Sequence, residues 1–153
     1  MTTRRQLLRG GAAAAAAVWL APSLAAVDAA GVQVWKSPTC GCCGDWIKHL
    51  EASGFRVTVH DTGNAAARTR LKVPMKYGSC HTASVGGYAL EGHVPAREIK
   101  RLLAERPRAV GLTVPGMPLG SPGMEQPSGE RDAFEVLLLK PSGSTAVYAA
   151  YGK

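Results

Sequence analysis

Hydrophobic and polar positions divide the chain beyond residue 30 into short strands and helices. Residues 55–60 alternate apolar and polar side chains, and residues 31–36 form a second strand-like run, so both segments are predicted to be β-strands. Between them, residues 45–53 offer apolar side chains for one buried side of a helix. That helix is expected to end before Gly54, because glycine favours the left-handed conformation that follows many helices.

The middle of the chain predicts two further helices and a hairpin. A short helix is expected at residues 64–71, with Asn64 as its cap. The dipeptide Gly86-Gly87 separates two short strand-like runs and therefore predicts a β-hairpin. A third helix is expected to begin near Pro95, because proline suits the first turn of a helix.

The resulting order, β-α-β-α-β-β-α, indicates an α/β domain with a thioredoxin-like fold. In such folds a proline before the third strand is commonly cis and faces the cysteines, and Pro74 is the candidate here. The sequence leaves the isomer of the bond between Val73 and Pro74 open.

Residues 111–131 differ from the rest of the chain because they are rich in glycine and proline. They contain the tripeptide Pro-Gly-Met twice, ending at Met117 and Met124. This composition argues against a helix or a central strand, so the segment is predicted to be a loop. Two apolar runs, 134–140 and 145–151, then predict an added C-terminal β-hairpin that extends or covers the sheet.

The first residues predict an export signal rather than a part of the domain. A twin-arginine pair at residues 4–5 precedes an apolar stretch at 12–20, which is too short for a transmembrane helix, and residues 23–25 supply a small-x-small cleavage site. We therefore expect residues 1–25 to be a twin-arginine signal peptide and residues 26–153 to form one periplasmic domain without membrane insertion. The alternatives are a membrane anchor and a disordered tail.

The charge of the chain adds little to this interpretation. The 153 residues carry a formal net charge of +7, which falls to +4 once Arg4, Arg5 and Arg9 of the predicted signal are removed. No stripe of Lys and Arg interleaved with aromatic residues follows, so we expect no nucleic-acid partner.

Three of the four cysteines lie within four positions, at the predicted junction of the first strand and the first helix: Cys40, Cys42 and Cys43. A thiolate is favoured near the N-terminus of a helix. Four exported cysteines could form two disulfides, but adjacent cysteines make a poor framework for stapling a fold, so a functional role is expected. On one continuous helix Cys40 and Cys42 would point about 200° apart, so the sulfurs converge only if Cys40 lies in the preceding loop.

The dipeptide Cys80-His81 follows the candidate cis-proline and is predicted to supply two more ligands. His93 precedes the third helix and is a further candidate ligand, although capping or solvation is an equally natural role there. His49 and His60 are expected to be solvated.

Met117 and Met124 lie on the Gly/Pro loop, where methionine has no core to fill unless the loop folds down and buries it. Thioether and thiolate sulfurs are soft donors that select Cu(I). Four thiols with imidazole and thioether nearby exceed what one tetrahedral zinc ion needs. Polynuclear Cu(I) bridged by thiolates fits this donor set better, while mercury and cadmium are chemically permitted.

Four segments of the chain carry a resemblance to a known family: CGCCGDW (40–46), VPMKYGSCHT (73–82), YALEGHVPA (88–96) and VPGMPLGSPGME (114–125). From residue 34 to about residue 148 the chain resembles the CopG family of periplasmic copper-resistance proteins, which is also described as an uncharacterised metal-binding family. The resemblance implies a thioredoxin-like fold and copper bound by the C-x-C-C cysteines in a multinuclear site. It also implies a part in copper tolerance, with copper redox chemistry as an option.

The predicted metal ligands are Cys40, Cys42, Cys43, Cys80, His81, His93, Met117 and Met124. The expected cargo is Cu(I), as several ions per chain, and the expected partners are copper ions and other periplasmic copper-handling proteins. The three cysteines of the motif would bridge metals, Cys80 would close the cluster, and the two histidines would cap its open side.

The rival hypothesis is a thiol–disulfide oxidoreductase with Cys40 as nucleophile and Cys43 as resolving thiol. Cys42 and Cys80 argue against it, because a dithiol exchanger needs neither. A structural zinc protein is the third possibility, and the sequence does not decide whether the protein is an enzyme.

Overall fold

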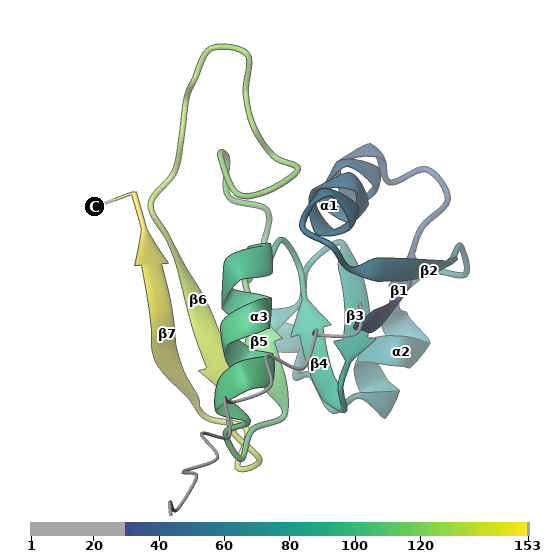
Figure 1. The fold of residues 1–153 in the computed structure, drawn as a ribbon, viewed down its shortest axis with the longest axis vertical. Helices are drawn as coiled ribbons and strands as arrows, with labels where there is room; N and C mark the ends of the chain where they lie inside the picture. Colours follow the sequence, from purple (N-terminus) through teal and green to yellow (C-terminus); the bar gives the residue numbers. More distant parts are fainter. Residues whose placement is uncertain (1–29, 153) are drawn as a thin grey trace, which may run out of the picture.

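A seven-stranded mixed sheet organises the protein in a computed structural model, which describes residues 30–152 (Figure 1). The strands lie side by side in the order β2-β1-β3-β4-β5-β6-β7. Along the chain the elements are β1 Gly31–Lys36, α1 Gly41–Ala52, β2 Arg56–His60, α2 Ala65–Arg70, η1 Met75–Tyr77, β3 His81–Val85, β4 Tyr88–Glu91, α3 Ala96–Glu105, β5 Gly111–Thr113, β6 Phe134–Leu139 and β7 Thr145–Tyr151.

The mixed α/β class predicted from the sequence is confirmed. The predicted C-terminal hairpin is present as β6 and β7, and it extends the sheet at one edge while β2 forms the other. The predicted signal peptide, residues 1–25, lies outside the described residues. Within residues 30–152, no helix combines the length and the apolar composition that a membrane span requires.

The exclusion of a central strand from residues 111–131 was wrong at its first three positions. Residues Gly111–Thr113 form β5, which lies in the sheet between β4 and β6. A Cβ atom on Gly111 would lie only 1.7 Å from the backbone oxygen of Ala89, so the two strands approach where no side chain fits. Glycine here permits the close approach of backbones rather than interrupting the strand.

Helix α1 begins four residues earlier than predicted, at Gly41 instead of residue 45. Cys40 is its N-cap residue and has an extended backbone, with φ −78° and ψ 96°. Cys40 therefore lies outside the helix, as convergence of the three thiols requires, while Cys42 lies in the first turn. Gly54 follows the helix with φ 91°, as its predicted capping role demands.

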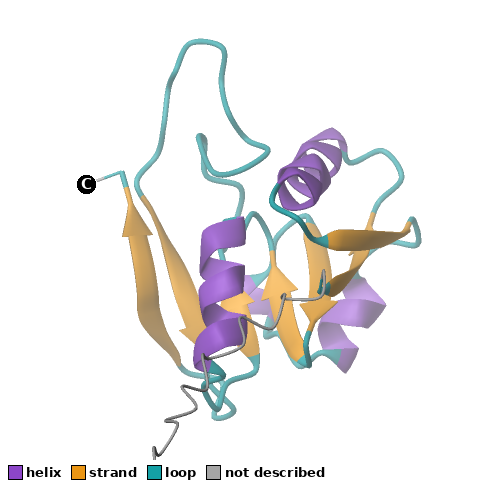
Figure 2. Ribbon diagram, viewed as in Figure 1, coloured by secondary structure: helices purple, strands orange, loops and turns teal. Residues whose placement is uncertain are grey.

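Helices cover both faces of the sheet. Trp46 of α1 and Ile99 of α3 pack into the larger core cluster together with Leu90 of β4. The neighbouring residue Ala89 belongs to a second cluster with Val73, which follows α2. Because successive strand residues point to opposite faces, α1 and α3 cover one face and the α2 segment covers the other (Figure 2).

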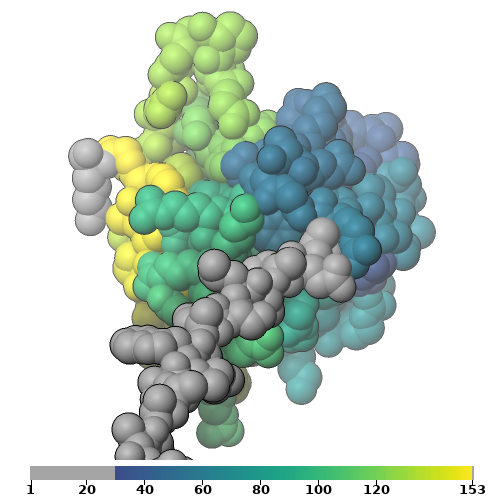
Figure 3. Space-filling view, in the orientation of Figure 1, coloured from purple at the N-terminus to yellow at the C-terminus, as the bar shows by residue number. Residues whose placement is uncertain are grey.

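The predicted Gly/Pro/Met loop is confirmed for residues 114–133, which connect β5 to β6 without helix or strand (Figure 2). In the space-filling view this loop rises beside the α1 segment (Figure 3). The described residues contain no cis peptide bond, so Pro74, the candidate cis-proline, follows a trans bond.

Candidate metal centre

Four cysteine sulfurs meet at the N-terminus of α1. The antiparallel pairing of β1 with β3 sets Lys36 opposite His81, which brings Cys80 beside the cysteines that follow β1. The Cys80 sulfur lies 4.0 Å from that of Cys42 and 3.4 Å from that of Cys43. With Cys40, whose sulfur lies 3.7 Å from that of Cys42, all four sulfurs fall within 4.8 Å of one another.

Cys80 also belongs to a second group, which it forms with two buried histidines. Its sulfur lies 3.3 Å from Nδ1 of His81 and 3.2 Å from Nε2 of His93. The three donor atoms of this group also lie within 4.8 Å of one another. The structure thus brings six of the eight predicted ligands together, with Cys80 at the centre.

Two of the four cysteines are joined covalently. A disulfide links Cys40 to Cys43, whose Cα atoms are 5.4 Å apart, while Cys42 and Cys80 are free thiols. Metal ligands must be thiolates, so binding through all four cysteines requires reduction of this disulfide first.

The ring of His93 is held in one tautomer. Its Nδ1 donates a hydrogen bond to the carbonyl oxygen of Pro122 at 2.8 Å, which leaves Nε2 unprotonated and directed to the cysteine cluster. A ligating histidine typically donates its other ring N–H to a carbonyl or carboxylate in this way. Burial lowers the pKa of His93 and so favours the neutral, metal-binding form.

His81 is buried and neutral. Burial, and secondarily the repulsion that a protonated His81 would meet from a protonated His93, lowers the pKa of its imidazole to about 3. The ring packs on the indole of Trp46, with 4.3 Å between the ring centroids. Its Nε2 atom is buried and has no hydrogen-bond partner among the described residues.

Cys80 is a protonated thiol in this environment. Burial, and secondarily the neighbouring Cys42, raises its pKa to about 12. The binding of a soft metal ion by Cys80 would therefore release the proton of its thiol. Thiolates with neutral imidazoles are a donor set that suits Cu(I), so the residues present fit that ion.

Comparison with known proteins agrees with this geometry. The family model described as "Protein of unknown function, DUF411" matches residues 77–124. Two solved structures, "Copper resistance protein copG" in Form 1 and Form 2, are each 49 % identical to this chain. Each match covers 80 % of this chain and 98 % of the solved chain, with a TM-score of 0.75. The chain belongs to the CopG family. It has no match among curated protein sequences.

The two loop methionines of this CopG-family chain have different surroundings. The side chain of Met117 is 53 % exposed. Met124 follows Gly123, where an added Cβ atom would lie 2.8 Å from the backbone oxygen of Cys42. Residue 124 is thus next to a backbone contact with the cysteine helix, and a ligand role for either methionine stays a prediction.

A buried ion pair that the sequence did not predict contacts Ser79, the residue before Cys80. Nη2 of Arg68 lies 2.7 Å from Oε1 of Glu91, and the two side chains are 9 % and 0 % exposed. The only sequence cue was an acidic residue at the end of a short apolar strand, directly before Gly92 and His93. An acidic residue at this position is equally typical of the solvent-exposed end of a strand.

His49 and His60, which were expected to be solvated, are half-buried and have hydrogen-bond partners within the protein. Nε2 of His49 accepts a hydrogen bond from the backbone N–H of Ala96 at 3.0 Å, so this side chain ties α1 to the start of α3. Nε2 of His60 lies 2.8 Å from the side-chain oxygen of Gln33, and its ring stacks on Trp35. Both histidines serve the fold.

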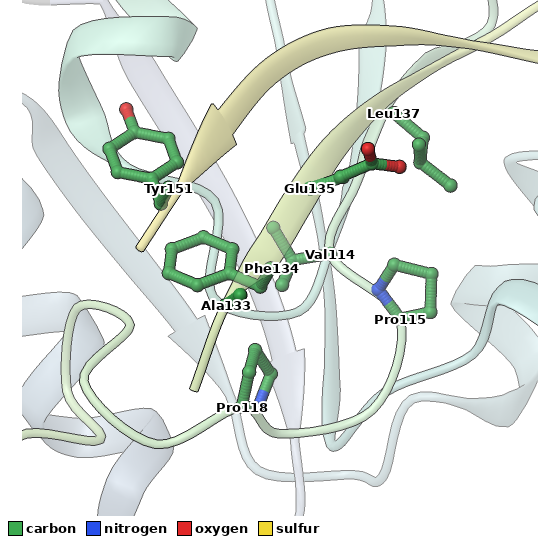
Figure 4. Close-up of a pocket in the computed structure, with 8 residues that line it drawn as sticks. All are labelled: Val114, Pro115, Pro118, Ala133, Phe134, Glu135, Leu137 and Tyr151. Atoms are coloured by element: carbon green, nitrogen blue, oxygen red, sulfur yellow. The ribbon is translucent and has the colours of Figure 1, made fainter. Parts of the chain in front are cut away.

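A cavity of about 470 Å³ lies at the base of the loop and is lined by Val114, Pro115, Pro118, Ala133, Phe134, Glu135, Leu137 and Tyr151 (Figure 4). None of the predicted metal ligands lines it. This cavity is therefore separate from the candidate metal centre.

Proposed function

We propose that this CopG-family protein holds several Cu(I) ions in a thiolate cluster and serves copper resistance. The proposal includes a thioredoxin-like fold, export to the periplasm by way of residues 1–25, and exchange of copper with other periplasmic copper-handling proteins. The name of the two solved relatives, copper resistance protein, supports the copper part of this proposal.

The observation that carries the proposal is the position of Cys80 between two groups of donors. Cys80 forms one group with three other sulfurs and a second group with two imidazoles, and the donor atoms of each group lie within 4.8 Å of one another. A structural zinc site uses four ligands in a closed tetrahedron, and this set is larger. If each thiolate bridged two metal ions, all four sulfurs and both imidazoles could take part in binding. Soft sulfur donors select Cu(I).

Copper redox activity is the second part of the proposal, and the disulfide supports it. If the reduced pair Cys40 and Cys43 met two Cu(II) ions, the two thiols would give up two electrons and two protons. The products would be two Cu(I) ions and the Cys40–Cys43 disulfide. A thiol reductant would then have to return two electrons to the disulfide before the pair could bind metal again.

Replacing single cysteines tests the proposal. We expect Cys42→Ser and Cys80→Ser each to lower the number of Cu(I) ions bound by the reduced protein and to lower copper tolerance in cells. Serine nearly preserves the volume of cysteine but offers a hydroxyl, which binds Cu(I) poorly. Thermal melting of the copper-free variants separates a folding defect from a loss of ligands.

A thiol–disulfide oxidoreductase is the second candidate, favoured by the Cys40–Cys43 disulfide and by the Cys80 sulfur 3.4 Å from that of Cys43. In that case Cys40→Ser would abolish a robust disulfide reductase activity. If the Cys42→Ser and Cys80→Ser variants at the same time bound copper like the parent, the copper cluster would be the wrong function.

A further inference from the structure

An ion pair is buried directly beneath the segment that carries Cys80 and His81. Arg68 comes from α2 and Glu91 from the end of β4. Oε1 of Glu91 lies 2.9 Å from Nε of Arg68 and 2.7 Å from its Nη2, so the guanidinium grips one carboxylate oxygen with two of its nitrogens. Neither residue is among the predicted metal ligands.

The carboxylate of Glu91 holds the ligand segment from both ends. Oε1 accepts a hydrogen bond from the backbone N–H of Ser79 at 2.7 Å, and Oε2 accepts one from the hydroxyl of Thr82 at 2.6 Å. Ser79 and Thr82 flank the Cys80-His81 dipeptide, so both of its neighbours are tied to one side chain.

Arg68 also bonds to the backbone of the ligand segment. Its Nη2 donates a hydrogen bond to the backbone oxygen of Ser79, whose N–H is already bound to Glu91. Both backbone groups of the residue before Cys80 are therefore occupied by the ion pair. Asn64 donates a further hydrogen bond to the same oxygen at 3.2 Å.

The ion pair also lies close in sequence to His93, the third predicted ligand of the group formed by Cys80, His81 and His93. Glu91 is followed by Gly92 and then by His93, and the N–H of Gly92 donates to the backbone oxygen of His81 at 3.0 Å. Gly92 has φ 72°, and an added Cβ atom would lie 2.6 Å from the hydroxyl oxygen of Ser79. The ion pair of Arg68 and Glu91 is thus bonded to residues next to Cys80 and His81, and Glu91 itself lies two positions before His93.

We propose that Arg68 and Glu91 are positioning residues, which hold Cys80, His81 and His93 in the geometry that metal binding requires. A buried ion pair adds little net stability, because the loss of hydration offsets much of the attraction. Its contacts here go to Ser79 and Thr82, which flank the ligands Cys80 and His81, so its effect falls on the placement of these ligands. The inference rests on the proposed function only for the identity of the metal.

The test separates placement of ligands from stability of the fold. The variants are Glu91→Asp, which draws the carboxylate back by one methylene, and the double variant Arg68→Met with Glu91→Gln, which leaves no unpaired charge. Glu105→Gln is the matched control, because Glu105 lies 2.7 Å from Arg101 in an exposed ion pair of α3. All proteins are reduced and freed of copper before measurement.

Two readouts apply to each variant that melts within a few degrees of the parent. Competition with a chromophoric Cu(I) chelator measures affinity, and we expect it to fall about tenfold to a hundredfold in both Glu91 variants and to be unchanged in the control. Alkylation of Cys80 by iodoacetamide, followed by mass spectrometry, measures its exposure without copper. We expect this rate to rise about tenfold as the segment opens locally.

The outcomes are distinguishable. Parent-like copper affinity and parent-like alkylation of Cys80 in both Glu91 variants would overturn the positioning role. If the parent itself bound no Cu(I), the proposed function would fail, and the alkylation rates alone would decide this inference. Should Glu91→Asp not fold, the charge-balanced double variant decides in its place.

Discussion

The two Pro-Gly-Met segments of the loop share a sequence but not their surroundings. At the first, a Cβ atom added to Gly116 would meet nothing within 4 Å, and Met117 is 53 % exposed. At the second, a Cβ atom on Gly123 would lie 2.6 Å from the backbone nitrogen of Trp46 in α1. The carbonyl oxygen of Pro122 also accepts a hydrogen bond from His93.

This difference shows that the repeated tripeptide specifies a backbone shape and not a set of contacts. Both glycines have a positive φ, 71° at Gly116 and 84° at Gly123. In the first segment Gly116 donates to the backbone oxygen of Gly78 and accepts a hydrogen bond from the hydroxyl of Ser79, while Gly116 and Met117 stay exposed. In the second segment Gly123 packs against the backbone of α1, and the carbonyl oxygen of Pro122 orients the predicted ligand His93. We therefore expect copper binding to depend mainly on the second segment.

Alanine in place of each glycine should give the largest difference between the two segments. Gly123→Ala adds a Cβ atom against backbone atoms of α1 and strains a left-handed residue, so we expect a loss of roughly 2–5 kcal/mol in the free energy of unfolding. Gly116→Ala meets only the backbone strain, about 1–2 kcal/mol. Urea unfolding of the copper-free proteins measures both values.

Equal losses in the two alanine variants would show that the contact between Gly123 and α1 is not tight. A copper titration of the same proteins adds a second check. Gly123→Ala should weaken copper binding because the hydrogen bond from His93 to Pro122 is disturbed, while Gly116→Ala should bind copper like the parent.

Leucine in place of each methionine should give a smaller difference, confined to copper. Met124→Leu removes the soft thioether of a predicted ligand, and we expect Cu(I) affinity to fall about tenfold. Met117→Leu is the matched control, and its affinity should change less than about twofold, because the side chain is exposed. Chelator competition measures both, and a larger loss in Met117→Leu would reverse the assignment of roles.

Acidification should give the smallest effect, and it concerns the histidines beside the second segment. The pKa of His81 is lowered to about 3 by burial and by His93, so below about pH 6.5 the unfolded chain binds a proton that the folded chain does not. Stability is therefore fully present above pH 6.5 and is lost as the pH falls. We expect about 1 kcal/mol between pH 7.5 and pH 6 from His81.

Melting of the copper-free protein across this pH range measures the loss. His81→Leu fills the same buried site without a titrating group, so its melting temperature should depend less on pH. A pH dependence equal to that of the parent would show that His81 is not the group responsible.

Local patterns were enough to predict the parts of the site that lie close together in sequence. The strand at 31–36, the cysteine junction and the role of Gly54 depend on neighbouring residues, and the structure contains all three. Cys80 was predicted as a ligand because it follows Pro74, which a thioredoxin-like fold would place opposite the cysteines. Its distance from each C-x-C-C cysteine depends on how β3 lies against β1, which no local pattern gives.

The features that sequence analysis missed depend on contacts between distant segments. Gly111 lies in a strand because β4 and β6 flank it, and its own neighbours in sequence favour a loop. Arg68 and Glu91 are 23 positions apart and form a pair only once α2 covers the sheet. No periodic pattern in the chain distinguishes either case from a surface turn or a solvated charge.

The central claim is that one chain holds more than one Cu(I) ion through the cysteines gathered around Cys80. An anaerobic Cu(I) titration of the fully reduced protein, repeated with Zn(II) as competitor and checked by elemental analysis, tests it most directly. We predict saturation above one equivalent of Cu(I) per chain and a clear preference over zinc. Saturation at one equivalent, with zinc competing on equal terms, would contradict the claim.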